Sequence, residues 1–391
     1  MNLPFGYLTV LVLIAVCALI ALAAPGRPRP LAMLAFRLGV AVNELPFVVF
    51  AWLLAATVLA LVQGDLTSPL LAGAAAVTTA GLGLVAWRGH RALPAVQRAM
   101  GAVPVSRRLP YRRILFRPFF RRHRGVERIP DLPYGPAGRR NLLDLYRRRS
   151  RPAGVPVLIH LHGGGYTSGR KNSQSLPLLY RLAGQGWVCV SANYRLRPQA
   201  TFHDHVVDAK KVIAWVREHG PAYGADPDRI ILAGSSAGAH MAALAALTPA
   251  DPAFQPGFEH VDTSVAAVIG LGGYYGPYDD ADAQTSPLAH VGPDAPPFFL
   301  VHGDHDTVVP VEGARVFAER LCGLSTRPVV YAELPGGQHA FDLFHSLRFE
   351  AVVNAVDAFA AHVLPPGSRA MAAAPDREIL EDADSGRTHG P

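Results

Sequence analysis

The sequence predicts an α/β fold with a mostly parallel central sheet, preceded by transmembrane helices at the N-terminus. Two observations predict it. From about residue 129, short β-branched runs alternate with amphipathic stretches, which is typical of parallel strands joined by crossover helices. Before residue 88, three uncharged runs hold most of the apolar surplus of a chain that is 50% apolar and only 17% charged. This composition excludes a disordered or fibrous protein.

The three uncharged runs are residues 5–24, 45–62 and 68–87. Each has about the 18 to 20 residues that a helix needs to cross roughly 30 Å of hydrocarbon, although the third is rich in Ala, Gly and Thr. A cleaved signal peptide is the alternative for the first run, because Ala21-Leu22-Ala23 resembles a cleavage site. Residues 1–4 hold no Lys or Arg, which argues against cleavage. Residues 1–88 are therefore expected to form a membrane anchor of three transmembrane helices.

Arginines beside these runs predict the orientation of the anchor. The first connection carries Arg27, Arg29 and Arg37, the second carries only Asp65, and arginines are dense after Trp87. Cytoplasmic connections carry the excess of cations. We therefore expect a multi-pass protein of the cell membrane, with its N-terminus outside and the domain after residue 129 on the cytoplasmic side.

Residues 89–128 are rich in Arg and contribute much of the net charge of +7. Aromatic residues interleave with these cations, as they do in proteins that bind single-stranded nucleic acid. The position directly after a membrane span favours a juxtamembrane linker held on anionic lipid headgroups, and Pro104, Pro110 and Pro118 exclude one continuous basic helix. We therefore expect the membrane as a partner and no nucleic acid.

Residues 129–365 are predicted to form the α/β domain, and residues 366–391 a disordered tail. Apolar residues on one face of 206–218 predict a crossover helix that ends at Gly220-Pro221. Functional residues of such a sheet lie at the carboxyl ends of its strands. Six runs are interpreted as buried strands: 155–161, 187–192, 230–233, 265–271, 298–302 and 329–334.

A candidate nucleophile follows the run 230–233. Gly234-Ser235-Ser236-Ala237-Gly238 fits the pattern G-x-S-x-G and stands between an apolar strand and an Ala-rich helix. That pattern places one serine hydroxyl at a sharp turn between strand and helix, where it is exposed to substrate. The sequence therefore predicts Ser236 as a nucleophile, with a purely structural turn as the alternative.

Three glycines that follow the run 155–161 predict an oxyanion hole. The segment is His162-Gly163-Gly164-Gly165-Tyr166, and glycines let backbone N–H groups approach one point closely. Gly163, Gly164 and Gly165, together with Ala237, are the expected donors. A phosphate cradle is the alternative, but the spacings typical of such loops are absent from the sequence. His162 is expected to orient the loop.

An acid and a base follow the last two strands. His302-Gly303-Asp304-His305-Asp306 offers two carboxylates, and Asp306 is preferred because an Asp at the place of Asp304 often caps its own loop. His339 follows the run 329–334 and is expected to take the proton of Ser236. The three cysteines fit no disulfide framework and no metal site. We therefore expect no metal and no cofactor.

These motifs, with Tyr194-Arg195-Leu196-Arg197-Pro198, resemble the bacterial carboxylesterase and lipase family related to hormone-sensitive lipase, and in particular its members with N-terminal membrane spans. The resemblance covers about residues 129–364. It implies an α/β-hydrolase fold, a triad of Ser236, Asp306 and His339, and a structural role for Asp208. It further implies hydrolysis of a small-molecule or lipid-like ester through an acyl-enzyme. The alternatives are an amide-directed hydrolase, such as a formamidase or peptidase, and a non-catalytic membrane protein of the same fold. The oligomeric state is not predicted.

Two features depart from the family pattern. The interval from Ser236 to Asp306 is shorter than usual, and the shortening falls in residues 272–297, where other members build part of the cap over the active site. This segment is rich in Gly, Asp and Pro, so it predicts little of a lid. Gln199 stands where the family has an acidic residue.

Overall fold

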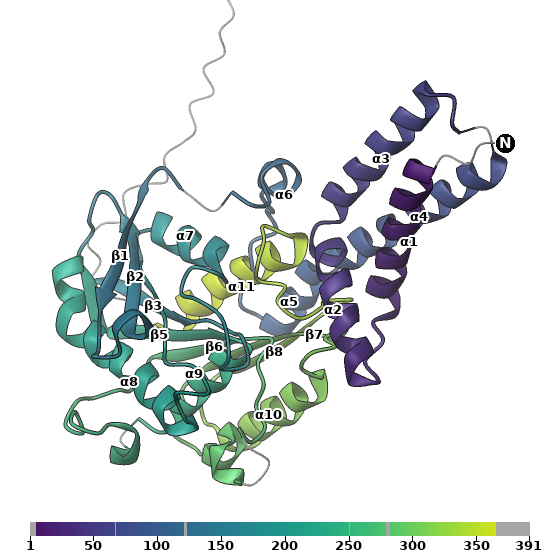
Figure 1. Cartoon of the computed structure of the whole chain (residues 1–391). Coiled ribbons are helices and arrows are strands. Elements are labelled where there is room, and N and C mark those ends of the chain that lie inside the picture. Colours follow the sequence, from purple (N-terminus) through teal and green to yellow (C-terminus); the bar gives the residue numbers. More distant parts are fainter. Residues whose placement is uncertain (1–4, 67, 121–122, 250, 279–281, 365–391) are drawn as a thin grey trace, which may run out of the picture.

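The computed structural model describes residues 5–66, 68–120, 123–249, 251–278 and 282–364. Within them, an α/β domain carries a group of N-terminal helices that extends away from one end of its sheet (Figure 1). The predicted tail, residues 366–391, lies outside the described residues.

The sheet has eight strands in the order β1-β2-β4-β3-β5-β6-β7-β8. β2 pairs antiparallel with β1 and with β4, and all the other pairs are parallel, which confirms the predicted mostly parallel sheet. The strands are β1 (Val126–Pro133), β2 (Leu142–Arg148), β3 (Val155–Leu161), β4 (Val188–Ala192), β5 (Ala225–Ser235), β6 (Ala267–Leu271), β7 (Phe298–Gly303) and β8 (Val329–Leu334).

The strands β1 and β2 were not predicted, because charged residues interrupt their apolar pattern. Asp144 in the middle of β2 is fully buried and is paired with Lys171 and Arg128. β8 was predicted as a buried strand, but it lies at the edge of the sheet and several of its side chains are only half-buried.

Helices cover both faces of the sheet (Figure 1). Alternate residues of β5 enter the two cores: Ile230 and Leu232 face one, Ile231 and Ala233 the other, as the alternation of side chains along a strand requires. The first core includes residues of α8 (Phe202–His219), α9 (Ala237–Leu247) and α10 (Val311–Leu324). The second includes residues of α5 (Ala92–Met100), α7 (Leu176–Gly184) and α11 (Leu347–Val363).

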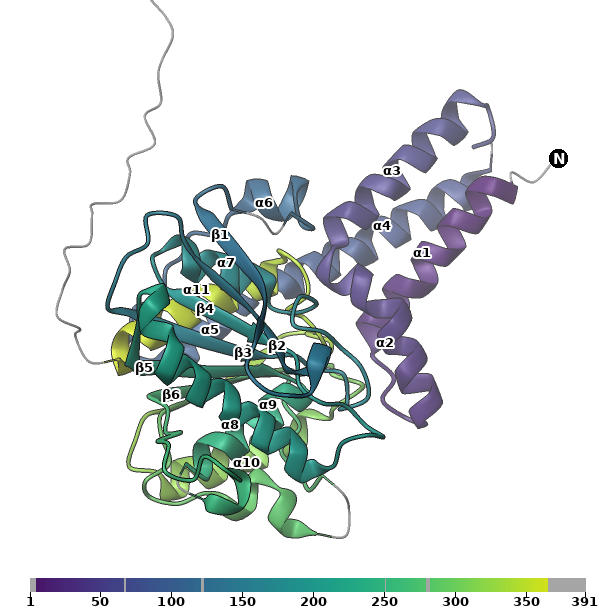
Figure 2. The ribbon, with the colours of Figure 1, turned by 60° about the vertical axis from the view of Figure 1, so that its left-hand side comes forward.

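The N-terminal helices are α1 (Phe5–Ala23), α2 (Arg29–Glu44), α3 (Pro46–Val62) and α4 (Pro69–His90). By length and composition, two helices could cross a membrane: Phe5–Ala23 and the continuous stretch Pro69–Met100. α2 and α3 meet at an angle of 85° and count as a third candidate if the bent pair is one span. In both views α1, α3 and α4 extend away from the α/β domain, whereas α2 lies beside it (Figure 2).

Part of the segment predicted as a juxtamembrane linker, residues 89–128, belongs to the α/β domain. The apolar side chains of Leu93, Val96 and Met100 on α5 are buried in the same core as those of α7 and α11. A short helix, α6 (Tyr111–Phe116), follows before β1 begins. Apart from Arg91, the arginines of this segment therefore lie on or follow helix α5, which packs against the α/β domain.

The described part of the shortened segment 272–297 contains two 3-10 helices, η4 (Ala283–Thr285) and η5 (Pro287–His290). Each is a single turn, and η5 packs against α9. The remaining 3-10 helices are η1 (Gly138–Asn141), η2 (Gly220–Tyr223) and η3 (Pro252–Phe254).

Candidate active site

Ser236 lies at the turn between β5 and α9, in a backbone conformation with φ 54° and ψ −118°. A non-glycine residue with positive φ is strained and is retained where the surroundings hold it. The two flanking glycines are required by close packing, because a Cβ on Gly234 would lie 2.1 Å from the carbonyl oxygen of Gly238, and one on Gly238 would lie 2.1 Å from that of Leu161. The turn therefore presents the Ser236 hydroxyl at the carboxyl end of β5.

The structure brings Ser236, His339 and Asp306 together from three different loops. Ser236 Oγ lies 3.0 Å from His339 Nε2, and His339 Nδ1 lies 2.7 Å from Asp306 Oδ2. A carboxylate can only accept hydrogen bonds, so His339 Nδ1–H is the donor to Asp306. His339 Nε2 is then free to accept the proton of Ser236, which is the arrangement that general-base activation of a serine needs.

The charges of the two partners are set by their proximity. Burial by itself lowers the pKa of His339, but the nearby carboxylate of Asp306 outweighs it and raises that pKa above its usual value of 6.5. Burial by itself raises the pKa of Asp306, but the charge of His339 and hydrogen bonds from His302 and His339 hold it well below its usual range. Asp306 therefore stays ionised beside the imidazole.

The two candidate carboxylates in the loop after β7 have different partners. Asp306 Oδ1 accepts the N–H groups of Val308 and Val309, at 2.9 and 2.8 Å, which fixes the carboxylate toward His339. Asp304 Oδ1 instead accepts the N–H of Gly336 at 2.6 Å and so joins its loop to the loop that carries His339. Of the two carboxylates, Asp306 therefore contacts His339, whereas Asp304 contacts the backbone of Gly336.

The glycine loop differs from its prediction at one position. Gly163 was expected to donate to an oxyanion, but its N–H donates to Gln174 Oε1 at 2.6 Å and is already engaged. Among the described residues, no acceptor pairs with the N–H groups of Gly164, Gly165 or Ala237. These three remain candidate donors. Gly164 has φ 123°, and a Cβ there would lie 2.2 Å from the Ser168 carbonyl oxygen, so only glycine fits.

Aromatic side chains pack against the first residue of this loop. The ring of His162 stacks on that of Tyr194 with centroids 4.3 Å apart, and Tyr194 Oη donates to the His162 carbonyl oxygen. Burial lowers the pKa of His162 to about 4, so this ring is neutral near pH 7. His162 thus contacts Tyr194 and the backbone of Gly163 in this loop.

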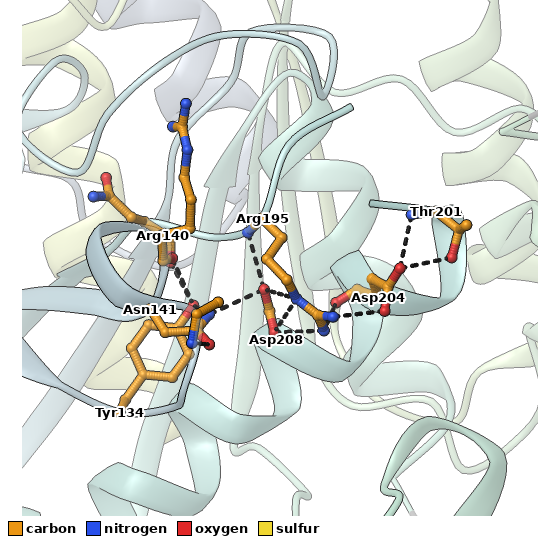
Figure 3. A network of polar contacts seen from close by, with 9 residues as sticks. Tyr134, Arg140, Asn141, Arg195, Thr201, Asp204 and Asp208 are labelled. Atoms are coloured by element: carbon orange, nitrogen blue, oxygen red, sulfur yellow. Dashed lines mark hydrogen bonds and ion pairs between the residues drawn. The ribbon is translucent and has the colours of Figure 1, made fainter. Parts of the chain in front are cut away.

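Asp208, on α8, ties the segment after β4 to the rest of the domain (Figure 3). Its buried carboxylate accepts hydrogen bonds from Asn141 Nδ2 and from the backbone and side chain of Arg195. Arg195 also pairs with Asp204, at 2.6 Å. Two residues further on, Arg197 N–H donates to the carbonyl oxygen of Tyr166, next to the glycine loop. The segment after β4 is thus fixed to α8 through Asp208 and contacts the residue that follows the glycine loop.

A second buried carboxyl group, which the sequence reasoning missed, lies behind the nucleophile. Asp342 Oδ2 accepts from Ser235 Oγ and Ser175 Oγ, each at 2.6 Å. Ser235 Oγ lies 3.0 Å from His160 Nε2. Burial raises the pKa of Asp342. The adjacent serines in the GSSAG motif thus have different surroundings, because Ser235 faces this interior network whereas Ser236 faces His339.

Among the described residues, no group of three or more His, Cys, Asp or Glu side chains is placed to hold a metal ion. The sheet order and the loops at the carboxyl ends of its strands are those of the α/β-hydrolase fold.

Comparisons with known proteins give its relatives. Residues 143–282 match the BD-FAE family model. The chain is 44% identical over 264 residues to the probable carboxylic ester hydrolase LipM, and 44% identical over 259 residues to the esterase LipQ, both from Mycobacterium tuberculosis. These matches cover 60% and 59% of this chain, and in both cases the chain spans only 61% of the length of the relative.

The esterase Est2 of Thermogutta terrifontis, solved with propionate bound, is similar in structure. Its TM-score is 0.53 at 27% sequence identity, and the match covers 62% of this chain and 97% of Est2. These relatives agree with the resemblance to carboxylesterases that the motifs indicated.

Proposed function

We propose that this protein is a serine carboxylester hydrolase that acts through an acyl-enzyme. The observation that carries the proposal is the chain of contacts from Ser236 through His339 to Asp306, next to N–H groups that have no partner among the described residues. Relatives that are named esterase or carboxylic ester hydrolase support the same chemistry. The proposed substrate is a small-molecule or lipid-like ester.

In the proposed reaction, Ser236 Oγ attacks the ester carbonyl carbon while His339 Nε2 takes its proton. The carbonyl oxygen becomes an oxyanion, which the N–H groups of Gly164, Gly165 and Ala237 hold; one such donor contributes roughly 3 to 4 kcal/mol in the transition state. His339 then gives the proton to the alcohol oxygen as its bond to the carbonyl carbon breaks. Water then attacks the acyl-enzyme while His339 takes its proton. As the bond between the carbonyl carbon and Ser236 Oγ breaks, His339 returns the proton to Oγ and the acid is released.

Labelling with a fluorophosphonate tests this proposal on the full-length protein in detergent. Ser236 Oγ is expected to displace fluoride and form a stable phosphonyl ester, which a fluorescent probe makes visible on a gel. Ser236→Ala is expected to lose the label. Ser150→Ala, which changes an exposed serine, is the matched control and should label like the parent. A parent protein that stays unlabelled while it is folded would contradict the proposal.

We also propose that the N-terminal helices cross the cell membrane and hold the hydrolase domain on its cytoplasmic side. Large apolar side chains are exposed along these helices, which in water would form an unfavourable patch. They include Val12, Leu13 and Leu19 of α1, Trp52, Leu54, Leu59 and Val62 of α3, and Leu70, Val77 and Trp87 of α4.

The arrangement of the connections supports this orientation. The connection from α1 to α2, with Arg27, lies at the end of the helices nearer the α/β domain, and α2 begins there at Arg29. The connection from α3 to α4, with Asp65, lies at the far end of the helices (Figure 1). Cations thus gather at the end of the helices that faces the hydrolase domain, as the positive-inside rule requires of a cytoplasmic side.

Reporter fusions test the orientation. A reporter that is active only outside the cytoplasm is expected to be inactive when it follows residue 391. The same reporter inserted beside Asp65 should be active. The reverse pattern would overturn the proposed orientation, and activity at neither position in an expressed protein would show that the helices do not cross the membrane.

A further inference from the structure

The helix α2 contacts the loops that carry the candidate base and acid. The rings of Phe36 and His339 meet edge to face, with centroids 5.8 Å apart at an angle of 74°. One turn earlier, the carbonyl oxygen of Ala32 accepts a hydrogen bond from Thr307 Oγ1 at 2.9 Å. Residues four apart lie on the same face of a helix. This face of α2 therefore lies against the loops at the carboxyl ends of β7 and β8 (Figure 1).

The end of α2 is fixed to the loop that carries His339. Asn43 Nδ2 donates to the carbonyl oxygen of Gly336 at 2.8 Å, and Ser346 Oγ donates to Glu44 Oε2 at 2.7 Å. Arg348 donates to the carbonyl oxygen of Asn43 at 2.7 Å. Asn43, Glu44 and Arg348 are buried, and Gly336 and Ser346 lie on either side of His339 in the chain. The distance between Phe36 and His339 is thus held by contacts on both sides.

These contacts place Phe36 beside one particular part of an ester. His339 Nε2 delivers the proton to the oxygen of the leaving alcohol, so this alcohol lies next to the imidazole when the ester is cleaved. Phe36 remains partly exposed after its contact with His339. Its ring can therefore contact an apolar group of the alcohol, whereas the carbonyl oxygen is expected at the glycine loop.

We propose that Phe36 is a specificity-determining residue of the active site and that it forms an apolar wall for the alcohol part of the ester. This inference rests on the proposed function. It gives the N-terminal helices a role in substrate recognition, because the short segment 272–297 contributes single turns in its described part and α2 covers the site beside His339. The ester that fits is one whose alcohol carries a long apolar chain.

Two esters with the same acyl group test the proposal: methyl butyrate and octyl butyrate, with the full-length protein in detergent. Phe36→Ala is expected to lower kcat/KM for octyl butyrate by about 10-fold, because apolar contacts with the chain are lost. For methyl butyrate kcat/KM should stay within about 2-fold of the parent, since an apolar pocket discriminates only by the methylene groups that it contacts. Leu34→Ala, an exposed residue on the same helix, is the matched control and should leave both values unchanged.

A second measurement separates specificity from placement of the base. Both esters form the same butyryl-enzyme, so its hydrolysis, followed after the burst with p-nitrophenyl butyrate, should be unchanged in Phe36→Ala. Equal losses for both esters with slower deacylation would show that Phe36 only positions His339 and would overturn the proposal. Unchanged kcat/KM for octyl butyrate would overturn it as well.

Failure of the inference is distinct from failure of the proposed function. Fluorophosphonate labelling has fluoride as its leaving group and needs no alcohol, so Phe36→Ala should label at the rate of the parent. If that variant does not fold, Phe36→Leu keeps an apolar side chain and should show a smaller loss that is again confined to octyl butyrate. A parent that hydrolyses neither ester and takes no label would refute the proposed function itself.

Discussion

Replacing Ser236 with Ala is expected to lower the turnover of a short-chain p-nitrophenyl ester by about 10⁶-fold. The reason is geometric, because Ser236 Oγ lies 3.0 Å from His339 Nε2 whereas the neighbouring hydroxyl, Ser235 Oγ, donates to Asp342. No second hydroxyl in the motif can therefore take over the attack. Residual hydrolysis would come from water held near the glycine loop.

The measurement compares initial rates of the parent, Ser236→Ala and Ser150→Ala, each purified as the full-length chain in the same detergent. Equal stability of the three proteins, seen as equal Tm, shows that the loss is chemical. Ester hydrolysis by Ser236→Ala at the rate of the parent would exclude Ser236 as the nucleophile. The contact between Ser236 and His339 would then have no role in catalysis.

Much of the α/β domain could be predicted because its strands are buried on both faces. Parallel strands of this kind give short continuous apolar runs. The predicted run 155–161 matches β3 in full, and the run 298–302 matches β7 to within one residue. The turn at Ser236 could be predicted for a related reason. There is no space for side chains at Gly234 and Gly238. The two glycines of the motif are therefore required by the turn and indicate it in the sequence.

Other features depend on contacts between distant segments and leave no local pattern. The N–H of Gly163 donates a hydrogen bond to Gln174. This bond depends on the conformation of the loop, which a run of three glycines does not specify. Asp342 follows His339 closely in the sequence, but its partners Ser175 and Ser235 lie at the start of α7 and the end of β5. The sequence predicts the segment of α2 only as a connection between two membrane spans, because no local pattern indicates that Phe36 contacts His339. Of these features, only the contact of Phe36 with His339 joins the N-terminal helices to the candidate site.

Replacing Asp306 with Asn is expected to lower turnover by about 10⁴-fold. An Asn amide can donate to His339 Nδ1, which would place the ring proton on Nε2, and that nitrogen could no longer accept the proton of Ser236. Asp304→Asn is the matched control, because it changes a carboxylate two residues away that contacts Gly336 and not His339. It should cause a much smaller loss. The opposite ranking of the two variants would assign the role of the acid to Asp304.

The same variant, Asp306→Asn, is expected to change the pH dependence of kcat/KM. His339 acts as a base only when neutral, so activity of the parent should fall as the pH drops through the pKa of His339. Burial lowers this pKa, and the carboxylate of Asp306 raises it above 6.5 in net terms. Because Asp306→Asn removes the opposing charge and leaves the burial, its acid limb should move to lower pH while its rate at every pH is smaller. An acid limb that stays where it is in the parent would mean that Asp306 does not set the proton affinity of the base.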